Sequence, residues 1–143
     1  IAALDDKFIA KLDHIPRRIG ILSQTTQVPT HFTYFVKKLI DDSFARDSEM
    51  RIIDTICHDI RERQTAAMKL ASQVDLMLVV GGHHSANTNR LAELCSQMTE
   101  THLIETAAEI QPSWLEGKRH IGLTAGASTD EQTVNEVLRA LQT

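Results

Sequence analysis

The fold is decided by residues 76–88, which run Leu-Met-Leu-Val-Val and then Gly-Gly-His-His-Ser-Ala-Asn-Thr. Five consecutive apolar residues predict a strand buried on both faces, and the glycine-rich loop after it leads into a segment with helical spacing. Similar apolar runs at 19–22 and 121–123 predict two more buried strands, and weaker strands are expected at 51–54 and 102–104.

Segments with helical spacing separate these strands. Their apolar residues recur at intervals of three and four positions, which places them on one face of a helix. The four stripes are Phe32, Phe35, Val36, Leu39 and Ile40; Ala67, Leu70, Ala71 and Val74; Leu91, Leu94, Cys95 and Met98; and Val134, Val137, Leu138 and Leu141. Alternating strands and helices predict an α/β fold of parallel sheets flanked by helices, built from repeated βα units in two small lobes.

Local signals refine this prediction. A further helix is expected over Leu4–Leu12, before Pro16, and a short helical turn around Trp114. The pattern from Thr129 to Gln132 predicts a capping box at the start of the last helix.

The composition fits a small globular protein and excludes several classes. The 143 residues are 42% apolar and 24% charged, with a formal net charge of −4. No apolar stretch approaches the ~20 residues of a membrane span, and no basic run points to nucleic acid. Two cysteines cannot build a disulfide framework, so we expect a reducing compartment. Because the sequence opens at Ile1 without methionine, we expect it to be a piece of a longer protein.

Small polar residues follow four of the predicted strands, at 23–26, 55–57, 81–88 and 124–129. Ligands of open parallel sheets bind beyond the carboxyl ends of the strands. Glycines, hydroxyls, an amide and the N–H groups of helix N-termini together suit a phosphate or diphosphate. Each loop taken alone is equally explained by turn and capping chemistry, and neither a Walker pattern nor GxGxxG is present.

The two cysteines differ in their surroundings. Cys95 lies on the apolar stripe of a predicted helix and is expected in the core. Cys57 precedes a helix and has Arg61 and Arg63 nearby, which favours a reactive thiolate; a buried thiol under a loop is the alternative. The histidines that could add zinc ligands lack the required spacing: His58, His83 and His84.

Four collinear motifs resemble the LytB/IspH family of 4-hydroxy-3-methylbut-2-enyl diphosphate reductases. They are Ser-Gln-Thr-Thr at 23–26, Thr-Ile-Cys at 55–57 with Arg63-Gln64, Val-Val-Gly-Gly-His-His-Ser-Ala-Asn-Thr-Asn-Arg-Leu at 79–91, and Gly-Leu-Thr-Ala-Gly-Ala-Ser at 122–128. The match covers nearly all of this chain and about the second half of the family's chain.

The resemblance implies a trefoil-like α/β fold whose first lobe is missing. Residues 1–56 would be the remainder of the middle lobe and residues 57–143 the C-terminal lobe. The implied enzyme holds a 4Fe–4S cluster and removes the allylic hydroxyl of its diphosphate substrate with two electrons and protons. The electrons would come from a donor such as ferredoxin or flavodoxin. Its products are isopentenyl and dimethylallyl diphosphates, in the last step of the non-mevalonate isoprenoid pathway. For an enzyme of this family the resemblance implies the bacterial cytoplasm, with a plastid as the alternative.

The resemblance also implies roles for particular residues. Cys57 matches the last of three cluster cysteines, and the substrate-binding positions are matched by Thr25, Ser85, Asn87 and Ser128. Ala86 stands where the family often has a second serine, and Ile60 where a threonine is common, so both positions lack a hydroxyl. The family's catalytic acid lies in the missing half, so no catalytic residue is assigned here, and these 143 residues alone are expected to be inactive.

Two other functions are compatible with the loops. One is a non-catalytic module that binds phosphate or diphosphate, and the other is a flavodoxin-like nucleotide binder, which the glycine-free loop at 23–26 serves poorly. The reductase interpretation requires Thr25, Cys57, Ser85, Asn87 and Ser128 to line a single cavity.

Overall fold

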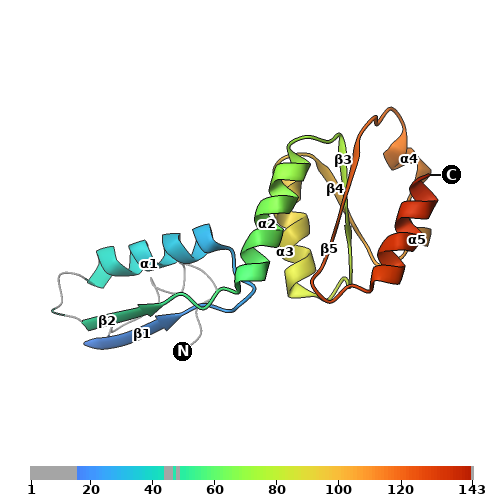
Figure 1. Ribbon diagram of the computed structural model, residues 1–143. Helices are drawn as coiled ribbons and strands as arrows, with labels where there is room; N and C mark the ends of the chain where they lie inside the picture. Colours follow the sequence, from blue (N-terminus) through green and yellow to red (C-terminus); the bar gives the residue numbers. More distant parts are fainter. Residues whose placement is uncertain (1–15, 44–46, 48, 143) are drawn as a thin grey trace. The chain divides into compact units, whose positions relative to one another are not determined.

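The protein divides into two compact units, residues 1–57 and 58–143. Figure 1 shows the computed structural model, which describes residues 16–43, 47 and 49–142. We call the two parts the N-terminal unit and the C-terminal unit. Both have the α/β architecture expected from the alternating pattern. The helix predicted over Leu4–Leu12 lies outside the described residues.

The N-terminal unit is a two-stranded parallel sheet with one helix. It consists of β1 (Arg18–Leu22), α1 (Pro29–Ser43) and β2 (Glu49–Ile53), and the strands pair from Arg18 opposite Glu49 to Leu22 opposite Ile53. Its core is small. Ile21 and Leu39 are buried, and five partly buried side chains pack against them: Ile19, Phe32, Phe35, Val36 and Met50.

The prediction that residues 19–22 form a strand buried on both faces is wrong about the second face. Ile19 and Ile21 belong to the core formed with α1, but Leu22 is 69% exposed. Because successive side chains of a strand point to opposite faces, one helix can cover only alternate residues of β1. Within the described residues, the sheet of this unit has two strands and α1 as its covering helix.

The C-terminal unit is a three-stranded parallel sheet with helices on both faces. The strands are β3 (Leu76–Val80), β4 (Glu100–Ile104) and β5 (Ile121–Ala125), in the order β4-β3-β5. Figure 1 shows α2 (His58–Ala71) and α3 (Ala86–Ser96) on one side of the sheet, and α4 (Pro112–Leu115) and α5 (Glu131–Leu141) on the other. The short 3-10 helix η3 (Ala107–Glu109) follows β4.

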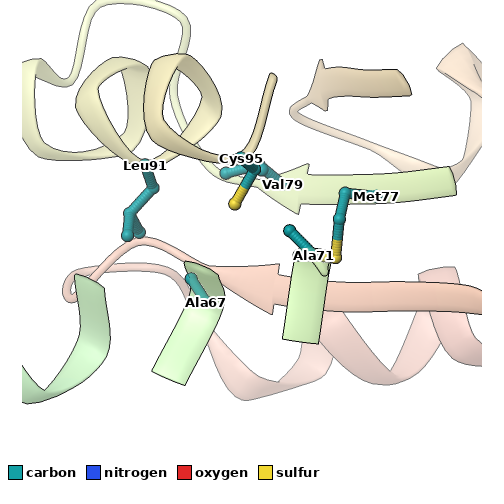
Figure 2. Close-up of a cluster of buried hydrophobic side chains, with 6 residues drawn as sticks. All are labelled: Ala67, Ala71, Met77, Val79, Leu91 and Cys95. Carbon is teal, nitrogen blue, oxygen red and sulfur yellow. The ribbon is translucent and has the colours of Figure 1, made fainter. Parts of the chain in front are cut away.

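The central strand explains why this unit is stable. All five residues of β3 are fully buried. Met77 and Val79 pack with Ala67 and Ala71 of α2 and with the α3 side chains Leu91 and Cys95, as Figure 2 shows. The other three residues of β3, at 76, 78 and 80, face the opposite layer, where Val137 of α5 is buried. Full burial of one such apolar side chain contributes about 1.5–3 kcal/mol, so β3 is the main contributor among the strands.

Two apolar stripes extend less far than their spacing predicted. Met98 is 50% exposed because α3 ends at Ser96, two residues before it. Leu138 is 40% exposed, since the buried position of α5 is its neighbour Val137. The short turn predicted around Trp114 is present as α4. Within the described ranges, none of the helices is long and apolar enough to cross a bilayer.

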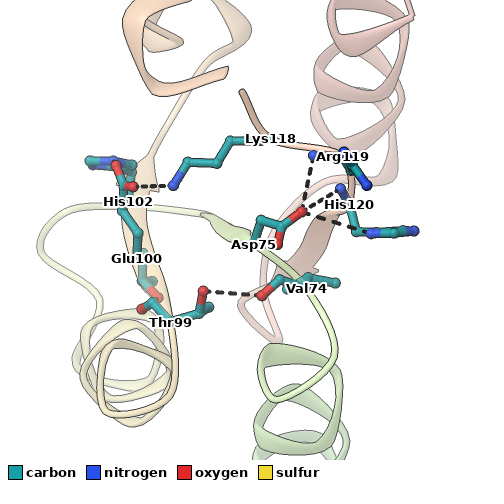
Figure 3. Close-up of polar contacts among 9 residues, drawn as sticks. Val74, Asp75, Thr99, Glu100, His102, Lys118, Arg119 and His120 are labelled. Atoms are coloured by element: carbon teal, nitrogen blue, oxygen red, sulfur yellow. Dashed lines mark hydrogen bonds and ion pairs between the residues drawn. The ribbon is translucent and has the colours of Figure 1, made fainter. Parts of the chain in front are cut away.

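Carboxylates organise the amino end of the sheet (Figure 3). Asp75 accepts hydrogen bonds from the backbone N–H groups of His120 and Arg119, both at 3.0 Å, and these bonds hold the pKa of its carboxyl below the usual value. Glu100 binds Lys118 at 2.6 Å and His102 at 2.9 Å. These contacts hold the turn before β5 at the amino end of the sheet. The polar loops after β3 and β5 lie at the opposite, carboxyl end.

The ring of His102 also stacks on Trp114 of α4. The two ring centroids are 3.8 Å apart and the ring planes differ by 5°. This stack attaches α4 to the surface of β4.

Candidate functional site

The loops after β3 and β5 meet at the carboxyl end of the C-terminal sheet. The strand order β4-β3-β5 places the strand that follows β3 along the chain on one side of it and the last strand on the other. In such a sheet the crevice for a ligand lies where the connections diverge, which here is between the ends of β3 and β5. The loop after β3 contains Ser85 and leads into α3, whose second residue is Asn87, and the loop after β5 contains Ser128.

Two glycines and two threonines join these loops. A Cβ atom on Gly81 would lie 2.7 Å from Thr129 Oγ1 and 3.0 Å from Thr88 Oγ1, and Gly81 adopts a φ of +147°. A Cβ on Gly126 would also collide with Thr88 Oγ1 and would lie 3.1 Å from Thr129 Oγ1. Both loops therefore require glycine, because only a hydrogen fits between the threonine side chains. The close packing brings Asn87 and Ser128, the chain neighbours of the two threonines, to one region.

The carbonyl of Val80 fixes the second loop to the central strand. It accepts hydrogen bonds from Gly126 N at 2.9 Å and from Thr129 Oγ1 at 3.0 Å. The capping box predicted for Thr129 to Gln132 is wrong, because the hydroxyl of Thr129 is used in this contact and the N-cap of α5 is Asp130. Thr129 thus holds the turn that contains Ser128.

The N-terminus of α3 presents polar groups without protein partners. Ser85 is the N-cap residue, and its Oγ accepts from Thr88 N at 3.3 Å. Asn87, one residue inside the helix, is only 8% exposed. Neither its Nδ2 nor its Oδ1 has a hydrogen-bond partner in the described part of the chain. Because buried polar groups are nearly always paired, this amide indicates a place for a ligand.

Two glutamates hold the first part of the loop after β3. Glu105 Oε1 accepts from His83 N at 2.6 Å, and Glu109 Oε2 lies 3.0 Å from His83 Nε2. Burial raises the pKa of Glu109, but hydrogen bonds from His83 and from the backbone of Glu105 and Thr106 outweigh it, so its pKa lies below the usual value. Asn89 Nδ2 closes the turn by donating to the carbonyl oxygens of His83 and Ser85. The loop is thus preformed around the start of α3.

Two neighbouring polar residues of α2 lie in the same unit, of which Gln64 is buried and Arg63 is half-buried. Arg63 Nη1 donates to the carbonyl oxygen of Ala125, at the end of β5, over 3.2 Å. Gln64 is 3% exposed. Arg63 Nε and Gln64 Nε2 are buried without a partner among the described residues. Arg63 therefore places a cation at the base of the loop that contains Ser128.

The N-terminal unit brings Thr25 and Cys57 together. Cys57 N donates to the carbonyl oxygen of Thr25 at 2.9 Å. Just before them in each loop, Ser23 N donates to Thr55 Oγ1 at 3.0 Å, and the Thr55 hydroxyl donates to the Ser23 carbonyl. These bonds tie the loop after β1 to the loop after β2 and leave the thiol of Cys57 exposed.

Comparison with known proteins identifies the family. The family model described as LytB protein matches residues 2–142. The chain belongs to the LytB family. Among its curated relatives, the 4-hydroxy-3-methylbut-2-enyl diphosphate reductase of Dehalococcoides mccartyi strain 195 is 57% identical over 137 residues, which are 96% of this chain and 48% of the relative. The reductase of the same name from Pelobacter propionicus is 47% identical over 125 residues, 87% of this chain and 43% of the relative.

Solved structures give the same result for this LytB chain. A reductase from Plasmodium falciparum, described as acting on E-1-hydroxy-2-methyl-but-2-enyl-4-diphosphate, matches with a TM-score of 0.86 and 26% identity, over 99% of this chain and 44% of that one. A structure described as (E)-4-hydroxy-3-methyl-but-2-enyl diphosphate reductase, the terminal enzyme of the non-mevalonate pathway, matches with a TM-score of 0.61 and 35% identity, covering 99% and 48%. The LytB chain spans about half the length of the curated relatives it matches.

The residues of this LytB chain fit an iron–sulfur cluster only in part. Such clusters are held by three or four cysteine thiolates. Cys57 is exposed, whereas Cys95 is fully buried in the core, where burial raises the pKa of its thiol to about 11. Across residues 16–43, 47 and 49–142, no three His, Cys, Asp or Glu side chains gather as metal ligands. The described residues thus offer one exposed thiol, that of Cys57, and not a complete set of cluster ligands.

The structure places the expected site residues of the LytB chain in two groups. Thr25 and Cys57 lie together in the N-terminal unit, and Ser85, Asn87 and Ser128 lie at the carboxyl end of the sheet in the C-terminal unit. Ala86 is exposed as the first residue of α3, and Ile60 is buried in α2. That all five lie along a single cavity stays a prediction.

The sequence does not predict that four of the residues of the LytB chain hold the loops of the site. Thr88, Thr129, Glu105 and Glu109 hold the two loops, yet each occurs in a stretch whose polar residues suit ordinary turns and caps. Each of the two loop glycines is followed by a threonine: Thr88 comes seven residues after Gly81, and Thr129 three residues after Gly126. This pattern indicates contact between the loops only once β3 is known to pair with β5.

Proposed function

We propose that this chain is the C-terminal part of a 4-hydroxy-3-methylbut-2-enyl diphosphate reductase, which converts that substrate to isopentenyl diphosphate and dimethylallyl diphosphate. The shared family and the names of the relatives support the proposal. In it, the C-terminal unit binds the diphosphate of the substrate, and the N-terminal unit contributes a cluster ligand.

The buried amide of Asn87 is the observation on which the proposal depends. Its Nδ2 is a neutral donor without a partner among the described residues, and it lies beside the first N–H groups of α3. An oxygen of a diphosphate would accept from both, and the positive end of the helix dipole favours the negative charge. The hydroxyls of Ser85 and Ser128 add donors from the two loops that meet there. The free energy of binding at this remote group would orient the reacting end of the substrate.

The N-terminal unit supplies the second part of the proposal. Cys57, exposed beside Thr25, would be one ligand of a 4Fe–4S cluster in the full-length protein. When bound, such a cluster provides the path by which two electrons reach the substrate. Thr25 would contact the substrate through its hydroxyl. The 143 residues alone would be inactive, because one thiolate does not hold a cluster.

The partners in this proposal follow from the chemistry. Reductive loss of a hydroxyl group consumes two electrons and two protons and releases the oxygen as water, and a small electron carrier such as ferredoxin or flavodoxin would deliver the electrons. The curated relatives compared above come from bacteria, so we propose the bacterial cytoplasm as the compartment.

The test replaces the side-chain NH₂ group of Asn87 by an oxygen in the full-length protein. In Asn87→Asp a carboxylate replaces the amide, removes the donor and repels a diphosphate. We expect the dissociation constant for inorganic diphosphate and the KM for the substrate to rise about 10- to 100-fold, which corresponds to the loss of a charge-assisted hydrogen bond.

Asn135→Asp is the matched control, because Asn135 is an exposed residue of α5. This variant carries the same chemical change and should bind as the unmodified protein does. Equal binding by the two variants would overturn the assignment of the diphosphate to the start of α3.

A further inference from the structure

A hydrogen bond between α2 and β5 connects parts of the chain that are 62 positions apart. Arg63 Nη1 donates to the carbonyl oxygen of Ala125 over 3.2 Å. Ala125 is the last residue of β5, and the turn that begins at Gly126 contains Ser128. The contact therefore lies at the point where the strand ends and the loop begins.

The geometry of the strand shows why this carbonyl needs a donor from outside the sheet. Gly126 N–H points toward β3, since it donates to Val80 O at 2.9 Å. Successive backbone groups of a strand point to opposite sides, so the carbonyl of Ala125 points away from β3. β5 is an edge strand in the described sheet, and no strand on its outer side accepts or donates there. Arg63 satisfies this carbonyl in place of a neighbouring strand.

The guanidinium is well suited to hold a loop. Arg63 lies in the second turn of α2, and that helix is anchored in the core through Ala67 and Ala71. Its planar group offers five N–H donors in a fixed geometry, and its Nε is buried without a partner among the described residues. A cation fixed at this point also adds a favourable charge for an anion bound by the loop.

We propose that Arg63 is a positioning residue, which acts through the carbonyl of Ala125 to hold the 126–129 loop and with it Ser128 in the geometry that binds a diphosphate. This inference rests on the proposed function of Ser128. Two hydrogen bonds thus restrain the two ends of the loop. Arg63 binds the carbonyl of Ala125, just before the loop, and Thr129 binds the carbonyl of Val80 at the end of the loop.

The first measurement does not depend on the proposed function. In the full-length protein, Arg63→Met removes the donor while keeping a long unbranched side chain on α2. We expect the backbone amides of residues 126–129 to exchange with solvent deuterium at least about tenfold faster, while those of α3 exchange as before. Lys69→Met is the matched control, because Lys69 is an exposed cation of the same helix, and it should leave the loop unchanged.

The second measurement connects the loop to the ligand. We expect Arg63→Met to raise the dissociation constant for inorganic diphosphate about tenfold, and to raise KM more than it lowers kcat. Arg63→Lys, which keeps the positive charge and a donor nitrogen at the end of the side chain, should give intermediate exchange and intermediate affinity. It also tests the inference if Arg63→Met does not fold.

Two results would overturn the inference. Unchanged exchange at 126–129 in both Arg63 variants would show that the guanidinium does not hold the loop. Faster exchange with unchanged diphosphate affinity would show that the loop does not position the ligand. A different result would contradict the proposed function itself: equal diphosphate affinity of Asn87→Asp and Asn135→Asp.

Discussion

Thr129 donates its hydroxyl hydrogen to the carbonyl oxygen of Val80 over 3.0 Å, and this bond joins the turn after β5 to the end of the central strand. The same carbonyl accepts from Gly126 N, so the turn is attached at both of its ends. Ser128 lies between these two attachments. The position of its hydroxyl therefore depends on the central strand rather than on α5.

Replacement of Thr129 by valine tests this dependence. Thr129→Val keeps the shape of the side chain and removes the donor. We expect the free energy of unfolding to fall by about 0.5–1.5 kcal/mol, because Gly126 N still satisfies the Val80 carbonyl. Urea unfolding followed by circular dichroism measures the change. Thr129→Ser should recover most of it, and Thr133→Val, in α5, should cost less than Thr129→Val.

A methyl group on Gly81 should be poorly tolerated. Its φ of +147° disfavours any side chain, and the new Cβ would lie 2.7 Å from Thr129 Oγ1. We expect Gly81→Ala to lower the free energy of unfolding by about 1–3 kcal/mol. Gly20→Ala is the control, because no atom lies within 4 Å of a Cβ there. Similar stability of the two variants in thermal unfolding would argue against the close packing of the loops.

The two thiols should react at very different rates. Cys57 is exposed, and Cys95 is fully buried with its pKa raised to about 11 by desolvation. At pH 8 about one thousandth of Cys95 would be thiolate even if reagents reached it. In the isolated chain, iodoacetamide should alkylate Cys57 in the native state and Cys95 only after unfolding, as peptide mass spectrometry would show. Equal labelling of both would contradict the burial of Cys95.

The proposed cluster ligand can be tested by iron content. Cys57→Ser in the full-length protein should lower the iron bound per chain and abolish most of the reductase activity, since serine does not replace a thiolate ligand. Cys95→Ala, which removes the other thiol, should leave the iron content unchanged. Iron stoichiometry equal to the unmodified protein in Cys57→Ser would refute the assignment.

The hydrogen bonds to Asp75 predict a pH-dependent contribution to stability. The backbone N–H groups of His120 and Arg119 lower the pKa of this carboxyl in the folded protein. Its contribution is therefore complete above the unfolded pKa of about 3.9, and is lost as the pH falls through the lower folded value. Asp75→Asn should destabilise the protein while the carboxyl is ionised, above about pH 5, and by progressively less as the pH falls below about 4.

The control for this prediction is Glu116→Gln, which makes the same change in net charge at an exposed carboxylate. Urea unfolding at a series of pH values would compare the two variants. A penalty for Asp75→Asn that grows on acidification would contradict the direction of the pKa shift.

The sequence predicted those features that follow from local pattern. Five apolar residues in a row are enough to predict β3 as the central strand, and the glycine-rich loop after it is enough to place Asn87 at a helix start. Leu22 shows the limit of such patterns. An apolar run indicates that a strand can be buried, but its exposure depends on which other elements cover it.

Contacts between distant residues could not be predicted in the same way. The four residues from Thr129 to Gln132 match a capping box, yet the hydroxyl of Thr129 makes a tertiary hydrogen bond instead. Arg63 was expected near the thiol of Cys57, and nothing in its local sequence indicates that its guanidinium would bind the carbonyl of Ala125. Such pairs become visible only when the order of the strands in the sheet is known.

The stack of His102 on Trp114 has a practical consequence for experiments on the two units. Trp114 is the chain's single tryptophan and lies in the C-terminal unit, whereas the single tyrosine, Tyr34, lies in α1 of the N-terminal unit. Indole fluorescence will change when the ring loses its imidazole neighbour. The phenol of Tyr34 is already 58% exposed, so its absorbance will change less, but any change comes from α1. One sample therefore contains a separate optical reporter for each half of the molecule, without any added label.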